Sequence, residues 1–369
     1  MIKPVFQLLV VFVFMITKQT EAQNGSYLCV GDHWTEEQGA QFLDSLKLEV
    51  KDFSDWDSRA KQIREGIISG GGLPELSISR SVPESQFGDP IIQQGYQVQS
   101  FAIQVSDTGW IYGNLYKPLK NRGKKALVLC PHGHWSSPDD YGRFRADMQM
   151  RCATLARMGA WVFAYDMLGY GETDYASHQH PDALTIQTMT GVRILDYFLS
   201  LKLIDKDRVA ITGASGGGTQ SFILTAIDPR IKVSVPAVQV SAHFFGGCLC
   251  ESGKPIHAWK GFQTNNVEIA ALAAPRPMLL ISDGDDWTKN TPEVEFPHIQ
   301  WIYSLYGASD KVENAHFENE VHNYGPNKRQ AMYKFMIKHL GLRPGDLQRK
   351  NGMIDESFVK ILTRNELTR

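Results

Sequence analysis

A glycine-rich turn at residues 212–218, T-G-A-S-G-G-G, constrains the fold of this chain more than any other segment. A short run with β-branched residues, 208–211, precedes it, and an apolar segment with helical spacing, 219–227, follows it. A strand, the motif G-x-S-x-G and a helix in this order predict a nucleophile elbow, in which Ser215 stands at the tip of a tight, strained turn. The two outer glycines of the motif are expected because the neighbouring chain passes so close that a Cβ atom would collide with it.

Short apolar segments alternate with amphipathic ones over much of the chain. A hairpin is predicted at residues 97–116, with its turn at 107–109. The strands predicted after it are 126–130, 161–165, 209–212, 231–235 and 277–282, and the predicted helices are 144–158, 184–201, 295–305 and 330–340. This alternation predicts a mostly parallel sheet covered by helices on both faces. Together with the elbow, it predicts an α/β-hydrolase fold.

The two ends of the chain have different predicted roles. Residues 1–22 have the features of a signal peptide, with Lys3 before an apolar run and a cleavage site after Ala22. We therefore expect a periplasmic or secreted protein, and the apolar run is too short for a stable membrane anchor. Residues 23–90 are predicted to form a helical extension, 91–345 the catalytic domain, and 346–369 a polar tail with one short helix.

Composition excludes some partners and bears on the cysteines. The 369 residues are 43% hydrophobic and 21% charged, with a formal net charge of −2 and no run of Lys or Arg. This balance is typical of a globular protein and gives no sign of a nucleic-acid partner; the oligomeric state stays open. The five cysteines are an odd number, which leaves at least one thiol free in an oxidising compartment. Cys130, in a predicted strand, and Cys152, in a predicted helix, are expected in the apolar core.

The elbow serine needs a carboxylate and a base. A serine hydroxyl is a poor nucleophile until a base removes its proton and an acid orients that base. In this fold the acid precedes the base, and both follow the serine in the chain. The strand at 277–282 leads into three aspartates. We favour Asp286 as the acid, because the turn at Gly284 lets the chain fold back and present the residue beyond it; Asp283 and Asp285 are the alternatives.

Four histidines lie downstream of these aspartates. His322 follows the last predicted strand and precedes the last long helix, where the general base is required. His298 comes too early in the chain, His316 lies in a strand-like segment, and His339 lies on the last helix. His322 is therefore the predicted base.

The oxyanion hole needs two backbone N–H groups aimed at the developing charge. Gly216, directly after the serine, is expected to supply one, and His134 or Gly133, in the loop after the strand at 126–130, the other. Aromatic rings suit the apolar faces of sugar rings. The residues expected to contact substrate from loops around Ser215 are Trp135, Trp259, Trp287 and His132.

A long irregular segment, 238–274, is expected beside the site, because long loops in compact domains are usually functional. It contains His243, Cys248, Cys250 and His257, which could in principle form a four-ligand zinc site. A serine hydrolase has no chemical need of a metal, so we expect neither a metal nor a cofactor here, and an active-site wall instead. A disulfide that involves Cys248 or Cys250 remains a further alternative.

Five motifs together resemble a known family. They are P-H-G-H-W at 131–135, Y-D-M-L-G-Y-G at 165–171, T-G-A-S-G-G-G-T-Q at 212–220, D-G-D-D-W-T at 283–288 and H-N-Y-G-P-N-K-R at 322–329. This combination resembles the acetyl xylan esterase-like branch of the α/β-hydrolases, from about Trp34 onward. The resemblance implies the triad Ser215, Asp286 and His322 and an exported serine esterase that removes acyl groups, by expectation acetyl, from polysaccharides or oligosaccharides.

Two other functions are compatible with the same fold. A peptidase of the prolyl-oligopeptidase type is disfavoured, because that type usually carries a large propeller before the hydrolase domain. A non-catalytic carbohydrate-binding relative is disfavoured, because Ser215, Asp286 and His322 are all present.

Overall fold

The computed structural model describes residues 34–74, 81–107, 109–120, 123–137 and 140–369. The expected signal peptide and Cys29 lie outside these residues. Among the residues that are described, no helix has the length and apolar character needed to cross a membrane.

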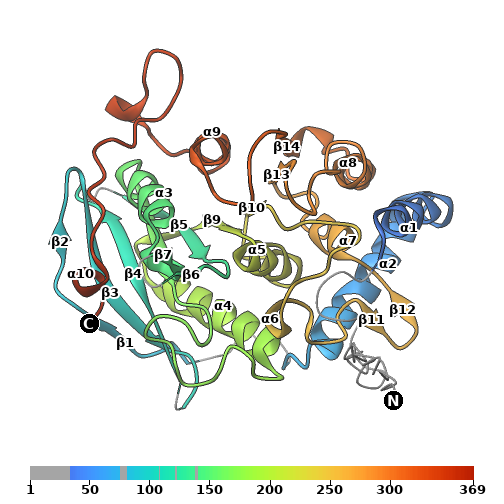
Figure 1. Cartoon of the computed structure of the whole chain (residues 1–369), viewed down its shortest axis with the longest axis horizontal. Helices are drawn as coiled ribbons and strands as arrows, with labels where there is room; N and C mark the ends of the chain where they lie inside the picture. The colour runs from blue at the N-terminus through green and yellow to red at the C-terminus, as the bar shows by residue number, and fades with distance from the viewer. Residues whose placement is uncertain (1–33, 75–80, 108, 121–122, 138–139) are drawn as a thin grey trace, which may run out of the picture.

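One twisted sheet dominates the described part of the chain (Figure 1). Its strand order is β1-β3-β4-β8-β5-β9-β10-β13-β14, and β2 pairs with β3. The bounds are β1 Ser85–Phe87, β2 Ile91–Ile92, β3 Tyr96–Gln104, β4 Trp110–Pro118, β5 Lys125–Pro131, β8 Ala160–Tyr165, β9 Ile204–Ala214, β10 Val233–Ala237, β13 Met278–Asp283 and β14 Val312–Phe317. The six neighbouring strands β8, β5, β9, β10, β13 and β14 are parallel to one another. Strand β4 pairs with β3 and with β8 in antiparallel orientation. The predicted mostly parallel sheet is confirmed.

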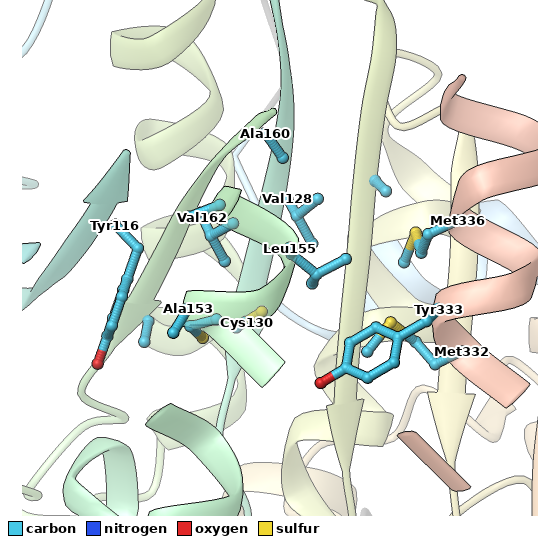
Figure 2. Close-up of a cluster of buried hydrophobic side chains, with 14 of the residues drawn as sticks. Tyr116, Val128, Cys130, Ala153, Leu155, Ala160, Val162, Met332, Tyr333 and Met336 are labelled. Carbon is cyan, nitrogen blue, oxygen red and sulfur yellow. The ribbon is translucent and has the colours of Figure 1, made fainter. Parts of the chain in front are cut away.

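Helices cover both faces of this sheet. Alternate residues of a strand point to opposite faces, so Val128 and Cys130 of β5 lie in one core cluster and Leu127 and Leu129 in another. The helices are α3 Ala146–Arg157, α4 Ala183–Ser200, α5 Gly216–Ile227, α8 Glu295–Leu305 and α9 Pro326–Leu340. Residues of α3 and α9 fill the first cluster, as Figure 2 shows for Leu155 and Tyr333, and α4 fills the second.

Some elements begin or end elsewhere than the sequence predicted. Helix α9 begins at Pro326, four residues early, because a proline at the first helical position is already in helical geometry and needs no N–H partner. Strand β9 begins at Ile204, which pairs with Lys125 beyond an irregularity in the register. The segment predicted to be irregular contains a short helix, α7 Asn266–Ala271, whose first N–H groups are capped by the Asn265 side chain.

The first described part of the predicted N-terminal extension, residues 34–74, is mostly helical, whereas residues 85–87 of the same predicted extension form strand β1. Helix α1 Glu36–Glu49 begins with a capping box at Thr35, and α2 Phe53–Glu65 is capped by Asp52. A short π-helix, Gly66–Gly70, follows α2. Apolar side chains of both helices are buried in one core cluster with α5, α7 and α8: they are Leu43, Leu46, Trp56 and Ile63.

The C-terminal tail contains the predicted short helix, α10 Arg364–Leu367. It also packs onto the domain, since Leu362 and Leu367 are buried. The Nδ2 group of Asn114 on β4 donates a hydrogen bond to the carbonyl of Leu367 at 2.8 Å. Figure 1 shows this segment running beside β3 and β4. The exact domain boundaries stay predictions.

Candidate active site

Ser215 stands between β9 and α5, at the tip of a turn. Its φ of 58° and ψ of −127° are strained values for a residue with a side chain. A Cβ atom on Gly213 would lie 2.6 Å from the carbonyl oxygen of Pro131, and one on Gly217 would collide with the same oxygen. The predicted steric reason for both glycines is confirmed. Ser215 remains partly accessible to solvent.

His322 and Asp286 meet at the same edge of the sheet. Asp286 follows β13 and His322 follows β14, and the Nδ1 group of His322 donates a 2.5 Å hydrogen bond to Oδ2 of Asp286. The other oxygen of Asp286 accepts bonds from the N–H and hydroxyl of Thr288, both at 2.6 Å. Burial alone would raise the pKa of Asp286, but the bonds from His322 and Thr288 outweigh it, and the pKa lies below its usual value.

The alternative acids have different environments. Asp283, at the end of β13, is fully buried and forms a 2.6 Å ion pair with Lys328 on α9. Asp285 is exposed. Of the three aspartates, Asp286 is the one that the structure joins to His322.

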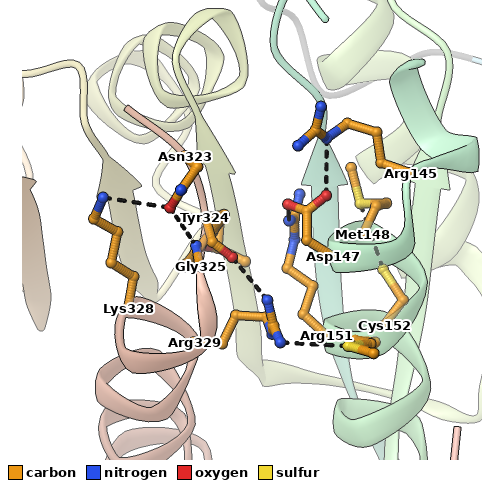
Figure 3. A network of polar contacts seen from close by, with 12 residues as sticks. Arg145, Asp147, Met148, Arg151, Cys152, Asn323, Tyr324, Gly325, Lys328 and Arg329 are labelled. Carbon is orange, nitrogen blue, oxygen red and sulfur yellow. Dashed lines mark hydrogen bonds and ion pairs between the residues drawn. The ribbon is translucent and has the colours of Figure 1, made fainter. Parts of the chain in front are cut away.

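Lys328 contacts the chain on both sides of His322, which the sequence did not predict. Its ammonium donates to Asp283 and, at 2.6 Å, to the carbonyl of Val321, and it lies 3.5 Å from the Asn323 side chain (Figure 3). Val321 and Asn323 flank His322 in the chain. The buried lysine therefore ties the loop that carries His322 to the strand that precedes Asp286. Lys328 precedes the last predicted helix, 330–340, and nothing in the local sequence predicted that it would be buried.

The loop after β5 lies against the elbow. A Cβ atom on Gly133 would lie 2.7 Å from the carbonyl oxygen of Ala214, and a Cβ on Gly216 would collide with the ring of His134. The structure thus brings together the three residues predicted to form the oxyanion hole. Burial, with a smaller effect from the charge of His322, lowers the pKa of His134 to about 4.

Two of the predicted substrate contacts flank His322. The ring of Trp135 stacks on His322 with centroids 6.2 Å apart, and the centroid of Trp287 lies 4.7 Å from it. Trp287 also stacks on Phe244 at 3.9 Å. The Arg145 guanidinium lies 4.4 Å above the Trp135 ring.

The other two residues predicted to contact the substrate, His132 and Trp259, contact protein groups instead. His132 is buried, its Nε2 accepts a bond from the N–H of Met167 at 2.9 Å, and its Nδ1 donates to the Gly133 carbonyl at 2.8 Å. Burial lowers the pKa of His132 to about 3, and neither ring nitrogen is left for a substrate. Trp259 belongs to a short hairpin and packs on the π-helix of the N-terminal extension, where a Cβ on Gly70 would lie 3.2 Å from its ring.

The other three histidines that follow the aspartates in the chain also contact protein groups. His316 on β14 bonds to Ser282 at 2.9 Å and to Glu318 at 2.8 Å. His298 on α8 is buried, which lowers its pKa to about 3, and His339 packs on Phe335.

The metal-ligand set that the sequence suggested does not come together. His243 contacts Ser241 at 3.1 Å, and His257 contacts Asn266 at 2.7 Å and stacks on Phe245. Cys248 and Cys250 form a disulfide with each other, which decides a point that the sequence left open. Their sulfur atoms lie instead beside His134 and His178.

Glu251, another residue that the sequence analysis missed, is buried in the same region. One of its carboxylate oxygens accepts from Thr219 at 3.3 Å and from Gln239 at 3.2 Å, and the other accepts from the N–H of Gly247 at 2.6 Å. Burial raises its pKa above the usual value. In the sequence, the only sign that Glu251 belongs to this region is its position directly after Cys250.

Comparisons with known proteins were made in sequence and in structure. No model of a known protein family matches the chain. YtaP of Bacillus subtilis (strain 168), named as a predicted hydrolase, is 27% identical over 240 residues, which cover 56% of this chain and 77% of YtaP.

The solved structures include several esterases. Methylesterase BT1017 is 40% identical, with a TM-score of 0.81, and the match covers 90% of this chain and 73% of that one. A protein described as an acetyl xylan esterase from Bacteroides fragilis NCTC 9343 shares the fold at 16% identity and a TM-score of 0.56, over 73% of this chain and 77% of its own. A CE15 glucuronoyl esterase from Teredinibacter turnerae T7901 does so at 14% identity and a TM-score of 0.57, over 78% and 86%.

These matches confirm the predicted α/β-hydrolase fold and show that the protein is a hydrolase. The likeness to methylesterase BT1017 is of a different order from the others, because it combines high identity with coverage of most of both chains. The chain belongs to the family of methylesterase BT1017 and has the α/β-hydrolase fold.

Proposed function

We propose that the protein is an exported serine esterase that hydrolyses ester groups on polysaccharides through an acyl-enzyme on Ser215. The observation that carries this proposal is the 2.5 Å hydrogen bond between His322 and Asp286 at the sheet edge where the elbow presents Ser215. In a triad, the base uses one ring nitrogen for the acid and the other for the serine. With Nδ1 of His322 bonded to Asp286, Nε2 is the nitrogen left for Ser215.

The proposed reaction proceeds in two halves. In the first, Ser215 Oγ attacks the ester carbonyl while Nε2 of His322 takes its proton, and the same proton then passes to the departing alcohol. In the second, Nε2 of His322 takes a proton from water as the water attacks the acyl-enzyme, and the same proton then passes to Ser215 Oγ as the acid leaves. The N–H groups of Gly216 and of His134 or Gly133 would donate to the oxyanion in both halves. Asp286 holds the ring and stabilises the imidazolium.

The substrate is proposed to be a sugar polymer with acyl groups. Trp135 and Trp287 contact His322, so their rings border the place where an ester would react. Aromatic faces of this kind can pack on a sugar ring and hold it beside the serine. The carbohydrate esterases among the structural neighbours support this substrate class, and the acetyl group is the acyl group that the sequence motifs predict.

A second candidate is the methyl ester of a sugar carboxylate, for which the acyl group would be the sugar and the leaving group methanol. The similarity to a methylesterase favours it.

The decisive experiment measures the small product of each ester. Acetylated xylan and methyl-esterified pectin are incubated with the enzyme, and acetate and methanol are assayed. Acetate release supports the first candidate and methanol release the second. Release of neither product, with cleavage of peptide substrates instead, would favour the prolyl-oligopeptidase type.

The role of Ser215 is tested separately. A fluorophosphonate probe should add its mass to the peptide that contains Ser215, and Ser215→Ala should abolish both labelling and hydrolysis of p-nitrophenyl acetate. His322→Ala should lose a similar factor, and the double variant little more, because triad members act as a unit. Labelling that persists in Ser215→Ala would contradict the proposal, and inactivity of the native protein would favour a carbohydrate-binding role. Export predicts a mature protein that begins at Gln23, which N-terminal sequencing can check.

A further inference from the structure

We propose that His134, His178, Cys248 and Cys250 bind one Zn²⁺ ion when the two cysteines are reduced, and that the disulfide is the oxidised, metal-free form of the same site. The sequence predicted no metal here, and the four possible ligands in its long loop included two other histidines, His243 and His257. The four ligand atoms of the set proposed here lie within 4.8 Å of one another. Nε2 of His134 lies 3.0 Å from Sγ of Cys250 and 3.3 Å from Sγ of Cys248.

The donor set matches the preferences of zinc. Two thiolates and two imidazoles form the Cys₂His₂ set of many tetrahedral zinc sites, in which zinc lies about 2.3 Å from sulfur and about 2.0 Å from nitrogen. Thiolates are soft ligands, so they select zinc over magnesium or calcium. All four positions would be filled by protein, which is typical of a structural rather than a catalytic zinc site.

The orientation of His178 supports a ligand role. Its Nδ1 donates a 2.9 Å hydrogen bond to the carbonyl of Leu168, which leaves the lone pair on Nε2. That Nε2 atom is buried and has no hydrogen-bond partner among the described residues. A metal-binding histidine almost always donates its other N–H to a carbonyl or carboxylate in this way.

His134 also directs one ring nitrogen to the two sulfur atoms, and its other nitrogen lies near a carboxylate without a direct hydrogen bond to it. Its Nε2 faces the two sulfur atoms, while its Nδ1 lies 4.0 Å from an oxygen of the buried Glu251 carboxylate. A carboxylate behind a ligating histidine fixes the ring and makes it a better donor. Glu251 is thus placed as a positioning residue for the proposed site.

The site would connect three loops at the edge of the sheet. His134 follows β5, His178 follows β8, and the two cysteines follow β10. The His134 ring also abuts Gly216, directly after the nucleophile. A zinc ion would therefore hold the loop that carries the proposed oxyanion donors, without taking part in the reaction itself.

The two forms of the site exclude each other chemically. Two thiol groups of a reductant such as dithiothreitol reduce the disulfide, giving two cysteine thiols and the oxidised reductant. Zn²⁺ then binds the two sulfur atoms and displaces their two protons to the solvent. In the disulfide neither sulfur is a thiolate, so the oxidised protein lacks half of the ligands.

The experiment uses the whole mature protein in both redox states. Oxidised and reduced samples are each dialysed against Zn²⁺ without oxygen, and bound zinc is measured by elemental analysis. We expect one equivalent in the reduced protein and none in the oxidised one. With Co²⁺ in place of zinc, the reduced protein should show the visible absorption of tetrahedral cobalt and a thiolate charge-transfer band.

Variants identify the ligands. His178→Ala and Cys248→Ser should each lose the bound zinc and the cobalt spectrum, while Glu251→Gln should bind about 10–100-fold more weakly. His316→Gln, at a partly buried histidine outside the cluster, is the matched control and should bind like the native protein. A reduced protein that takes up no zinc, or a His178→Ala variant that binds it unchanged, would overturn the proposal. Since metal content is measured without substrate, the result is independent of the proposed esterase function.

Discussion

At the scale of single residues, two neighbouring carboxylates have opposite roles. Asp286 bonds to His322, whereas Asp283 is buried against the ammonium of Lys328. In the proposed reaction, the first bond orients the base. The second holds the chain around the base, so its loss should affect folding first.

We therefore expect Asp286→Asn and Asp283→Asn to fail in different ways. Removing the acid of a serine-protease triad lowers kcat by about 10⁴ with little change in structure, and Asp286→Asn should behave likewise. Asp283→Asn leaves the buried ammonium with only the more distant carboxylate of Glu320, at 3.8 Å, and should reduce the free energy of unfolding by about 3–5 kcal/mol. Esterase assays and urea unfolding of both variants check this, with the exposed Asp285→Asn as control. An Asp286→Asn variant with native activity would remove Asp286 from the triad.

At the scale of elements, the elbow depends on how closely β9, α5 and the loop after β5 approach one another. Gly213 and Gly217 lie where a Cβ atom would meet the Pro131 carbonyl or the opposite side of the turn. The same contact places the loop carrying Gly133 and His134 over Ser215. Close packing of these elements is therefore a requirement of the site, because the proposed donors are backbone atoms.

The variant Gly213→Ala tests this requirement. Its methyl group would lie 2.6 Å from the Pro131 oxygen and must push β5 and β9 apart. We expect a loss of stability of about 1–3 kcal/mol. We also expect a roughly 100-fold loss of esterase activity, the order that a displacement of about 1 Å causes. Gly66→Ala is the control, since its methyl group would make only ordinary contacts at 3.5 Å or more. Equal effects in both variants would argue against a steric role of the elbow glycine.

At the scale of the whole molecule, burial of neutral histidines makes the stability depend on pH. Burial lowers the pKa of His132 and His298 to about 3 and that of His134 to about 4. In the unfolded chain these pKa values return to about 6.5, so below pH 6.5 the unfolded chain binds more protons. Each of the three histidines therefore reduces the free energy of unfolding as the pH falls from about 6.5 toward the pKa of that histidine in the folded protein. Glu295, whose pKa burial raises to about 7, acts in the opposite direction, since it keeps a proton that the unfolded chain releases.

The contribution of one histidine can be isolated by substitution. Near pH 5, His298 binds a proton in the unfolded chain but not in the folded protein. It should therefore lower the free energy of unfolding by about 1.4 kcal/mol for each unit that the pH falls. The variant His298→Met should thus show a shallower fall in the free energy of unfolding between pH 6 and about pH 5 than the native protein. Urea unfolding at several pH values gives both slopes. Identical slopes for the native protein and His298→Met would show that His298 is not held neutral.

The alternating sheet and helices, the elbow and the order of acid and base along the chain were predictable from the sequence alone. These features depend on local patterns: periodic apolar residues, glycines at a tight turn, and polar residues directly after strands. The same patterns placed Ser215, Asp286 and His322 at the carboxyl ends of parallel strands, where the structure finds them. Helix and strand ends were less predictable, because pairing partners and caps set them.

Tertiary structure alone decided which distant side chains meet. His132 and Trp259 were expected at the substrate but pack in the interior and on the N-terminal extension, because burial depends on neighbours far away in the chain. Lys328 pairs with a residue 45 positions earlier, and a lysine in a polar helix carries no local sign of that partner. Cys248 and Cys250 meet His134 and His178 rather than the histidines of their own loop, because the parallel sheet brings the ends of β5, β8 and β10 to one edge. Local patterns determine the elements, and only their packing determines these contacts.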